Sequence, residues 1–267
     1  MPTMKVPTLD PWDVQDHPLD NGTYVKVGRQ IKTAGNVTYH IYKTDTTPEL
    51  PSVTKVLAPT GPGFSVGMGW AIKEIREADG DLKAPQNTTD QAVAEGSAIH
   101  DAISRYIDHT SMTENNPAFI GWFHSIGNHP GRIWVASERY IFSQTHEFGG
   151  TLDAISMEEN GEYTLWDWKT KDKDKYYKNL KRYGPDTKDF CQASAYCAAL
   201  YEMGSKFAPS HAKIVYIFRD GTGCHEVDVD LKKYTPIFHA SRELQEMMDR
   251  ATLEAKHKAK MESEAKV

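Results

Sequence analysis

Cysteine is scarce in this 267-residue chain, and its three residues are Cys191, Cys197 and Cys224. Three cysteines are too few for a disulfide framework or for a four-cysteine zinc or iron–sulfur site. Long apolar runs are missing too, since none approaches the roughly 18 residues that span a bilayer. The first eight residues lack the apolar segment of a secretory signal. We therefore expect a cytoplasmic protein, in the host cell if a phage encodes it, with no membrane partner.

An excess of basic charge is also absent, because 31 Lys and Arg side chains face 37 Asp and Glu side chains, for a formal charge of −6. This balance argues against a protein that coats nucleic acid non-specifically, since phosphate affinity comes from Lys and Arg. It leaves room for an enzyme whose basic residues gather at one site. Hydrophobic residues make up 39% and charged residues 25%, which is ordinary for a globular protein with a substantial core.

The apolar pattern alternates between strand and helix periods. A β-hairpin is predicted from residues 23–27 and 36–42, with its turn at 34–36, and a short helix begins near 51–54. The glycine-rich residues 61–69 lack the Lys-Ser/Thr ending of a P-loop, so we expect a loop there. Helices are predicted at residues 65–78, 88–108, 116–127, 187–203 and from 236 onward. Strands are predicted at residues 133–142, 149–157, 163–169, 212–218 and 225–229.

This order of elements indicates an α/β (α+β-like) fold with a mixed sheet flanked by helices. No internal repeat or low-complexity linker divides the chain, so residues 1–267 are predicted to form a single domain. Within it we expect an N-terminal β-hairpin extension (1–50), a core (51–230) and a charged C-terminal helix (231–267).

Two acids and a lysine occupy the hairpin predicted at 149–169. Asp167 and Lys169 lie two apart in a strand and so share a face. A three-residue loop at 159–161 would place Asp153 opposite Asp167, whereas a two-residue loop would send the two acids to opposite faces. The longer loop needs a left-handed third residue, and Gly161 is there.

This arrangement is suited to hydrolysis at phosphorus. Carboxylate oxygens on neighbouring strands favour Mg²⁺ or Mn²⁺, and a lysine beside them can orient or deprotonate a water molecule and neutralise developing charge. The alternative is a pair of strand-end acids in a salt bridge with Lys169. Carboxylates inside a sheet rich in Trp, Leu and Ile are costly without a purpose, which favours the site.

Four more side chains are expected to converge on this hairpin: His100, Glu138, Gln192 and Tyr196. His100 lies on the predicted helix whose inner side carries Ile103, although a lone histidine there is commonly structural. Glu138 precedes the Asp153 strand and could instead pair with a surface cation. Gln192 and Tyr196 are one helical turn apart and share a face.

These motifs together resemble the RecB-type branch of the PD-(D/E)XK nucleases, and within it the mitochondrial genome maintenance exonuclease and phage-encoded relatives. The likeness covers about residues 50–200 and includes Pro51–Leu57, His100, Ser137-Glu138, Gly150–Asp153, Asp167–Thr170 and Gln192–Tyr196. It implies a restriction-endonuclease-like core with a mixed central sheet. One departure is Leu152, which stands where proline is common, and with three cysteines no iron–sulfur cluster is expected.

Roles follow from the resemblance residue by residue. It implies metal ligation by His100, Asp153 and Asp167, assisted by the Trp168 carbonyl, with Lys169 as the catalytic lysine. It further implies that Glu138 supports the site or a second metal, and that Gln192 and Tyr196 orient Lys169 or the substrate phosphate.

Residues 169–188 hold eight Lys or Arg side chains against three acids, with tyrosines interleaved. We interpret them as a loop that grips phosphate and offers platforms to unpaired bases, the alternative being a solvated charged loop. The candidate DNA-binding residues are Lys171, Lys173, Lys175, Tyr176, Tyr177 and Lys178. Core positions are expected for Trp12, Trp70, Trp122 and Trp134, and a surface helix from Arg242.

The function predicted from the sequence is metal-dependent exonucleolytic hydrolysis of DNA, with preference for single-stranded ends, in phage or genome DNA processing. One alternative is a recombination exonuclease that resects duplex ends. Another is a catalytically silent DNA-binding or assembly module on the same fold. A protein partner from a recombination or replication system is left open.

Overall fold

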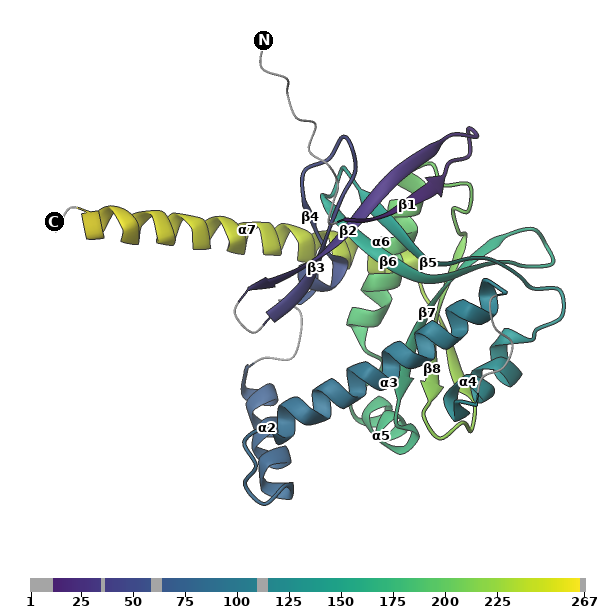
Figure 1. The fold of residues 1–267 in the computed structure, drawn as a ribbon, viewed down its shortest axis with the longest axis horizontal. Helices are drawn as coiled ribbons and strands as arrows, with labels where there is room; N and C mark the ends of the chain where they lie inside the picture. Colours follow the sequence, from purple (N-terminus) through teal and green to yellow (C-terminus); the bar gives the residue numbers. More distant parts are fainter. Residues whose placement is uncertain (1–11, 35–36, 59–63, 110–114, 265–267) are drawn as a thin grey trace, which may run out of the picture.

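The computed structural model of the chain describes residues 12–34, 37–58, 64–109 and 115–264. The predicted turn at 34–36 and the start of the glycine-rich loop therefore fall largely outside the described residues. Two sheets and a set of helices make up the described part (Figure 1). Among the described helices, none is both long and apolar enough to cross a membrane.

The N-terminal sheet contains the predicted hairpin and two further strands. Its order is β1 (Asp13–Pro18), β2 (Tyr24–Ala34), β3 (Val37–Lys43) and β4 (Leu50–Pro51), all antiparallel. β1 escaped prediction because its sequence, DVQDHP, is polar and ends in proline, as an edge strand often does. The short helix α1 (Val53–Val56) follows as expected, with Ser52 capping its N-terminus.

The second sheet is mixed and carries the site. Its order is β5 (Ile133–Ser143), β6 (Phe148–Met157), β7 (Tyr163–Lys171), β8 (His211–Phe218) and β9 (Cys224–Asp228). β7 and β8 are parallel, whereas the other neighbours are antiparallel. The parallel pair is possible because two helices, α5 (Lys173–Tyr183) and α6 (Thr187–Glu202), connect β7 to β8.

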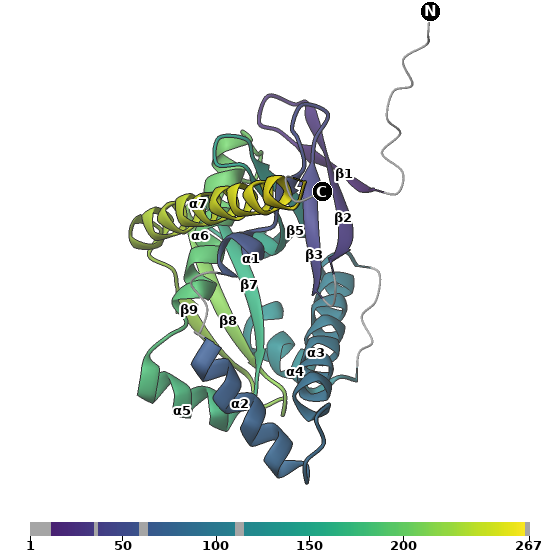
Figure 2. The ribbon, with the colours of Figure 1, turned by 90° about the vertical axis from the view of Figure 1, so that its left-hand side faces the viewer.

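Helices cover both faces of this sheet. On one side lie α3 (Ala84–Ile107) and α4 (Pro117–Trp122), the latter continued by a π-helical turn at Phe123–Gly127. On the other side lies α6, which shares a buried cluster with sheet residues such as Leu165 and Ile214 (Figure 2). Because neighbouring residues of a strand point to opposite faces, Trp166 and Trp168 pack under α3 and α4 while Leu165 faces α6. The predicted mixed α/β architecture is confirmed.

Two helices differ from their predictions. The loop expected between β7 and α6 is largely the helix α5, which Asp172 begins by accepting from the Lys175 N–H. Tyr176, Leu180 and Tyr183 recur at helical spacing, but the many charges of this segment favoured the prediction of a loop. α7 (Leu231–Glu264) starts before Pro236, because Asp230 accepts the Lys233 N–H and caps it earlier. The distal part of α7 extends away from the body of the protein (Figure 1).

The tryptophans do not all lie in the core. Trp122 is fully buried, and Trp134 packs partly buried beside it. Trp12 is half-buried in the N-terminal sheet beneath Lys43, and belongs to neither buried cluster. The core position expected for Trp70 was wrong, since this side chain is 41% exposed on α2 (Phe64–Glu77).

Candidate metal centre

The β6–β7 hairpin has the register that its loop predicts. The Glu158 N–H donates to the Glu162 carbonyl at 2.9 Å, and Gly161 takes the left-handed conformation at φ +80°. Ile155 then stands opposite Leu165, as expected. Regular pairing ends at Ala154 and Trp166, after which the two strands part. The site is built at this opening.

Asp153 is the first residue beyond the paired part of β6. Its Oδ2 accepts the backbone N–H of Trp168 at 2.6 Å, which takes the place of a ladder hydrogen bond. The carbonyl oxygen of the same Trp168 lies 3.1 Å from Nε2 of His100. The backbone of one residue therefore contacts both side chains, and the indole of Trp168 anchors it among Trp122, Trp134 and Trp166.

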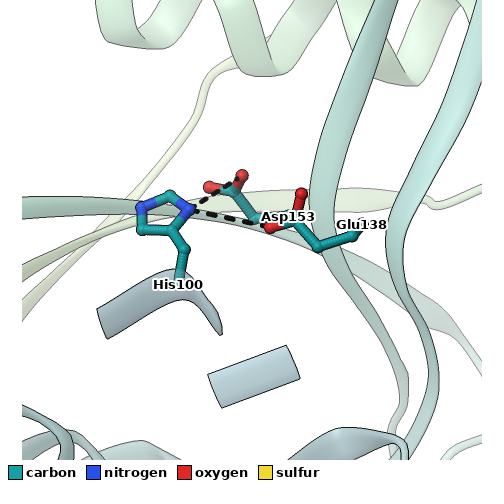
Figure 3. Close-up of side chains that lie close together, drawn as sticks. All are labelled: His100, Glu138 and Asp153. Atoms are coloured by element: carbon teal, nitrogen blue, oxygen red, sulfur yellow. Dashed lines mark ion pairs between the residues drawn. The ribbon is translucent and has the colours of Figure 1, made fainter. Parts of the chain in front are cut away.

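An imidazole and two carboxylates meet at this point (Figure 3). Nδ1 of His100 is 3.4 Å from Asp153 Oδ1 and 3.8 Å from Glu138 Oε1. One ligand atom from each of the three residues lies within 4.8 Å of the others. α3 supplies His100 from a helix that is anchored by the buried side chains of Ile99 and Ile103.

Glu138 is placed by an unusual backbone conformation. It has φ +46° within β5, which is uncommon for a residue other than glycine. Gln15 of β1, in the neighbouring sheet, fixes the backbone on either side of this residue. Its Nε2 donates to the Glu138 carbonyl and its Oε1 accepts the Tyr140 N–H, both at 3.0 Å. Sequence reasoning missed Gln15, because no local pattern connects residues 123 positions apart.

The electrostatics of the group favour a cation. Burial by itself lowers the pKa of His100, but Asp153 and Glu138 outweigh it and raise that pKa to about 10. Burial raises the pKa of Glu138, and the charge of Asp153 adds to this effect. For Asp153, burial is outweighed by His100 and Lys169, and the net shift of the pKa is downward. Two carboxylates this close repel each other unless positive charge lies between them.

Lys169 lies beside this group and is held from two sides. Its Nζ is 2.6 Å from Oδ2 of Asp167, the neighbour that strand alternation predicts. It also donates to Oε1 of Gln192 at 3.2 Å, and the Gln192 amide donates to the Tyr196 hydroxyl at 2.8 Å. Burial alone would lower the pKa of Lys169, but the carboxylates of Asp167, Asp189 and Asp153 outweigh it and raise that pKa. Lys169 therefore stays a cation at neutral pH.

Asp167 faces Lys169 and is not one of the three residues that meet at His100. It is fully buried, and burial raises its pKa, with Asp153 and Asp189 adding to the shift. Its Oδ1 has no hydrogen-bond partner among the residues that the structure describes. Asp189 was missed by sequence reasoning. It is a buried acid one helical turn before Gln192, and that spacing was the available signal.

The donors fit a divalent ion. They comprise the Nδ1 nitrogen of His100 and the carboxylate oxygens of Glu138 and Asp153, gathered at a partly buried point, while the Trp168 carbonyl lies at Nε2, the other ring nitrogen. Hard oxygen ligands with one imidazole suit Mg²⁺ or Mn²⁺. Oδ1 of Asp167, whose carboxylate already pairs with Lys169 through Oδ2, is a further acceptor without a hydrogen-bond partner among the described residues. These residues could therefore hold such an ion.

The DNA-binding candidates of the basic segment are spread over a helix rather than a loop. Lys173, Lys175, Tyr177 and Lys178 lie on α5, and Lys171 ends β7. Tyr176 is buried against Tyr216 and Phe218, and its hydroxyl lies 2.7 Å from His225 Nδ1, so it offers no platform for a base. Its interpretation as a stacking residue was wrong, because its ring fills the gap between α5 and β8.

Comparison with known proteins places the chain in a family. A family model described as the PD-(D/E)XK nuclease superfamily matches residues 117–265, which is more than half of the chain. The matched range includes Glu138, Asp153 and Lys169, while His100 comes from the helix before it. Among curated proteins, none matches.

Two solved structures show distant likeness. One, described as the crystal structure of SSO0001, has 15% sequence identity and a TM-score of 0.38, over 74% of this chain and 75% of that chain. The other is an alkaline exonuclease (LHK-Exo) from Laribacter hongkongensis, with 14% identity and a TM-score of 0.36, over 76% and 93% of the two chains. The family match is the finding that decides, and by it the chain belongs to the PD-(D/E)XK nuclease superfamily.

Proposed function

We propose that this protein is a metal-dependent exodeoxyribonuclease of the RecB-type branch, acting on single-stranded DNA ends in phage or genome DNA processing. The observation that carries the proposal is the group of His100, Glu138 and Asp153, within 4.8 Å, beside the half-buried cation of Lys169. A cluster of carboxylates with one fixed lysine suits phosphodiester hydrolysis, because both the nucleophile and the leaving oxygen need charge stabilisation.

Each residue has a distinct part in the proposal. His100, Asp153 and the Trp168 carbonyl bind the ion, and Glu138 completes or supports that set. A divalent ion held there supplies Lewis acidity and a water of lowered pKa. We keep Asp167 as a proposed ligand, because it follows directly on Trp166, the last residue paired with β6, and one of its oxygens has no hydrogen-bond partner among the described residues.

Lys169 is the proposed catalytic lysine. Its carboxylate neighbours raise its pKa, so it acts as a positive charge that orients water and stabilises the oxygens of the pentavalent phosphorus. Water forms a new P–O bond and gives up a proton to solvent, the P–O bond to the leaving oxygen breaks, and that oxygen takes a proton from solvent. Gln192 and Tyr196 are positioning residues that keep the ammonium group in place through two hydrogen bonds.

We further propose that residues 1–267 form one domain.

The proposal is tested on linear and circular DNA. Linear single-stranded oligonucleotides labelled at either end, matching duplexes, and a circular single strand are incubated with Mg²⁺. We expect linear single strands to be degraded first and the circle to survive. Cleavage of the circle at the linear rate would make the protein an endonuclease, and faster loss of duplex ends would favour the resecting alternative. No cleavage of any substrate would indicate a silent module.

A further inference from the structure

A groove lies beside the candidate centre, between helices that are far apart in the sequence. Its volume is about 560 Å³. Trp70 of α2 and Val93 of α3 form one wall, and Lys171 of β7 and Lys175 of α5 form the other. The views of Figures 1 and 2 both place α2 next to α5 at the end of the molecule away from the N-terminal sheet.

The groove is continuous with the centre because the same two elements build both. Val93 precedes His100 on α3 by two helical turns, about 10 Å at 1.5 Å per residue. Lys171 follows Lys169 on β7 by two residues, about 7 Å. A chain that extends from the candidate centre along α3 and β7 therefore reaches the groove within one or two nucleotides.

The charge of the groove suits phosphate. Among the described residues, neither Lys171 nor Lys175 forms an ion pair within 4.0 Å, although the buried carboxylate of Asp189 acts on Lys171 from farther away. Two acids also line the groove, and each caps the N-terminus of a helix. Asp172 accepts the Lys175 N–H at 2.8 Å, and Asp186 accepts the Lys188 N–H at 3.0 Å. Although the whole chain is acidic, this wall offers unpaired ammonium groups to an anion.

The opposite wall offers an aromatic surface. Trp70 is 41% exposed and Val93 is 62% exposed, although both are apolar. An exposed indole across from unpaired lysines is the combination that binds single-stranded nucleic acid, in which bases stack on the ring and phosphates meet the cations. Duplex DNA has its bases already stacked and cannot use the ring in this way.

We propose that this groove holds the single strand next to the scissile phosphate, with one base stacked on Trp70 and the backbone beside Lys171 and Lys175. The inference rests on the proposed nuclease function and adds a physical origin for single-strand preference. Because every base has a stacking face, the groove tolerates any sequence.

The test measures binding without cleavage. A fluorescein-labelled 12-nucleotide single strand is titrated in EDTA with the wild-type protein, Trp70→Ala and Trp70→Phe, and anisotropy reports the dissociation constant. Loss of one stacked base should weaken binding by roughly 5- to 100-fold in Trp70→Ala, with the phenylalanine variant in between. The control is Tyr24→Ala, an aromatic side chain 69% exposed on the N-terminal sheet, which should bind like wild type.

A second set of strands tests the stacked base directly. Oligonucleotides with a single abasic position, moved along the strand, keep every phosphate and remove one base. At one position the abasic strand should weaken binding to wild type but cause no further loss with Trp70→Ala, because the two changes remove the same contact. If Trp70→Ala binds with wild-type affinity, the proposed role of the groove is wrong. It is also wrong if the losses from the abasic position and from Trp70→Ala add up at every position.

Cleavage separates the two proposals. If Trp70→Ala loses affinity but the wild-type protein hydrolyses nothing with Mg²⁺, the groove stands and the nuclease assignment fails. If the wild type degrades single strands while Trp70→Ala binds them equally well, the nuclease assignment stands and the groove fails.

Discussion

The Asp153 carboxylate accepts the backbone N–H of Trp168 at 2.6 Å, at the point where β6 and β7 stop pairing. A side chain thus replaces the carbonyl that a regular ladder would supply. Asp153 is fixed by the backbone of the neighbouring strand, whose Trp168 carbonyl lies 3.1 Å from His100 Nε2. The opening of the sheet, rather than any loop, positions the candidate ligands.

Lys169→Ala separates the chemistry from ion binding. Turnover should fall by about 10²- to 10⁴-fold, the usual scale for losing one positioned electrostatic group. Mn²⁺ affinity, measured by calorimetry, should persist, because every carboxylate remains and one nearby positive charge is gone. If this variant loses Mn²⁺ as completely as Asp153→Asn does, then Lys169 holds the site together and the assigned role is wrong.

Gln15→Ala tests whether the N-terminal sheet positions Glu138. Removing the amide leaves the Glu138 carbonyl and the Tyr140 N–H without their partner and frees a strained backbone. Mn²⁺ affinity and cleavage should each fall by about 10-fold, on the scale seen for residues that support metal ligands. Val14→Ala, an exposed neighbour on β1, serves as the control. Equal losses in the two variants would show a general effect on the sheet.

Ion binding should release a proton. The free protein raises the pKa of His100 to about 10, so the imidazole is protonated at pH 7.5, whereas a metal-bound imidazole nitrogen cannot carry a proton. Mn²⁺ affinity should therefore increase with pH from about 7 towards 10. Calorimetry in two buffers of different ionisation enthalpy counts the protons, and we expect about one per ion. A pH-independent affinity would remove His100 from the ligand set.

The same pKa shift predicts how stability depends on pH without metal. Because the folded pKa lies above the unfolded value of 6.5, the contribution of His100 is fully present below pH 6.5 and is lost as the pH rises through about 10. Urea titrations should show the unfolding free energy falling over this range, and His100→Gln should flatten that part of the curve.

Gly150→Ala should destabilise the fold at the site. An added Cβ would lie 2.5 Å from the ring of Tyr196, which sits in a buried helix and has no room to retreat. We expect a loss of about 1–3 kcal/mol in urea unfolding. Gly96→Ala is the matched control, since its Cβ meets nothing within 4 Å and alanine favours a helix, so it should be neutral or stabilising. A neutral Gly150→Ala would contradict the close packing of Tyr196.

The register of the β6–β7 hairpin could be predicted because its information is local. Loop length, Gly161 and the apolar pair of Ile155 and Leu165 agree on one alignment, and the structure confirms it. The mixed sheet and most of its helices followed from periodicity for the same reason. α5 was missed although Tyr176, Leu180 and Tyr183 mark an apolar stripe at helical spacing, because its many lysines were interpreted as a charged loop.

Contacts between distant segments set the details of the site, and the sequence carries no pattern for them. Gln15 of the N-terminal sheet hydrogen-bonds to the backbone of Glu138, which has a positive φ. The side chain beside His100 and Asp153 is that of Glu138, whereas Asp167 lies outside this group. Trp70 is a large apolar side chain of the kind expected in a core, yet it is exposed because α2 lies at the edge of the molecule.

The central claim is that the group around Asp153 holds the ion for DNA hydrolysis. Its most direct test is the release of labelled nucleotides from a linear single strand by the wild type and Asp153→Asn, with Mg²⁺ and again with EDTA. The asparagine oxygen can still accept the Trp168 N–H, so folding should survive while the charged ligand is lost. We predict Mg²⁺-dependent release by the wild type, none in EDTA, and a fall of more than about 100-fold in the variant. Equal release by the two proteins would contradict the account.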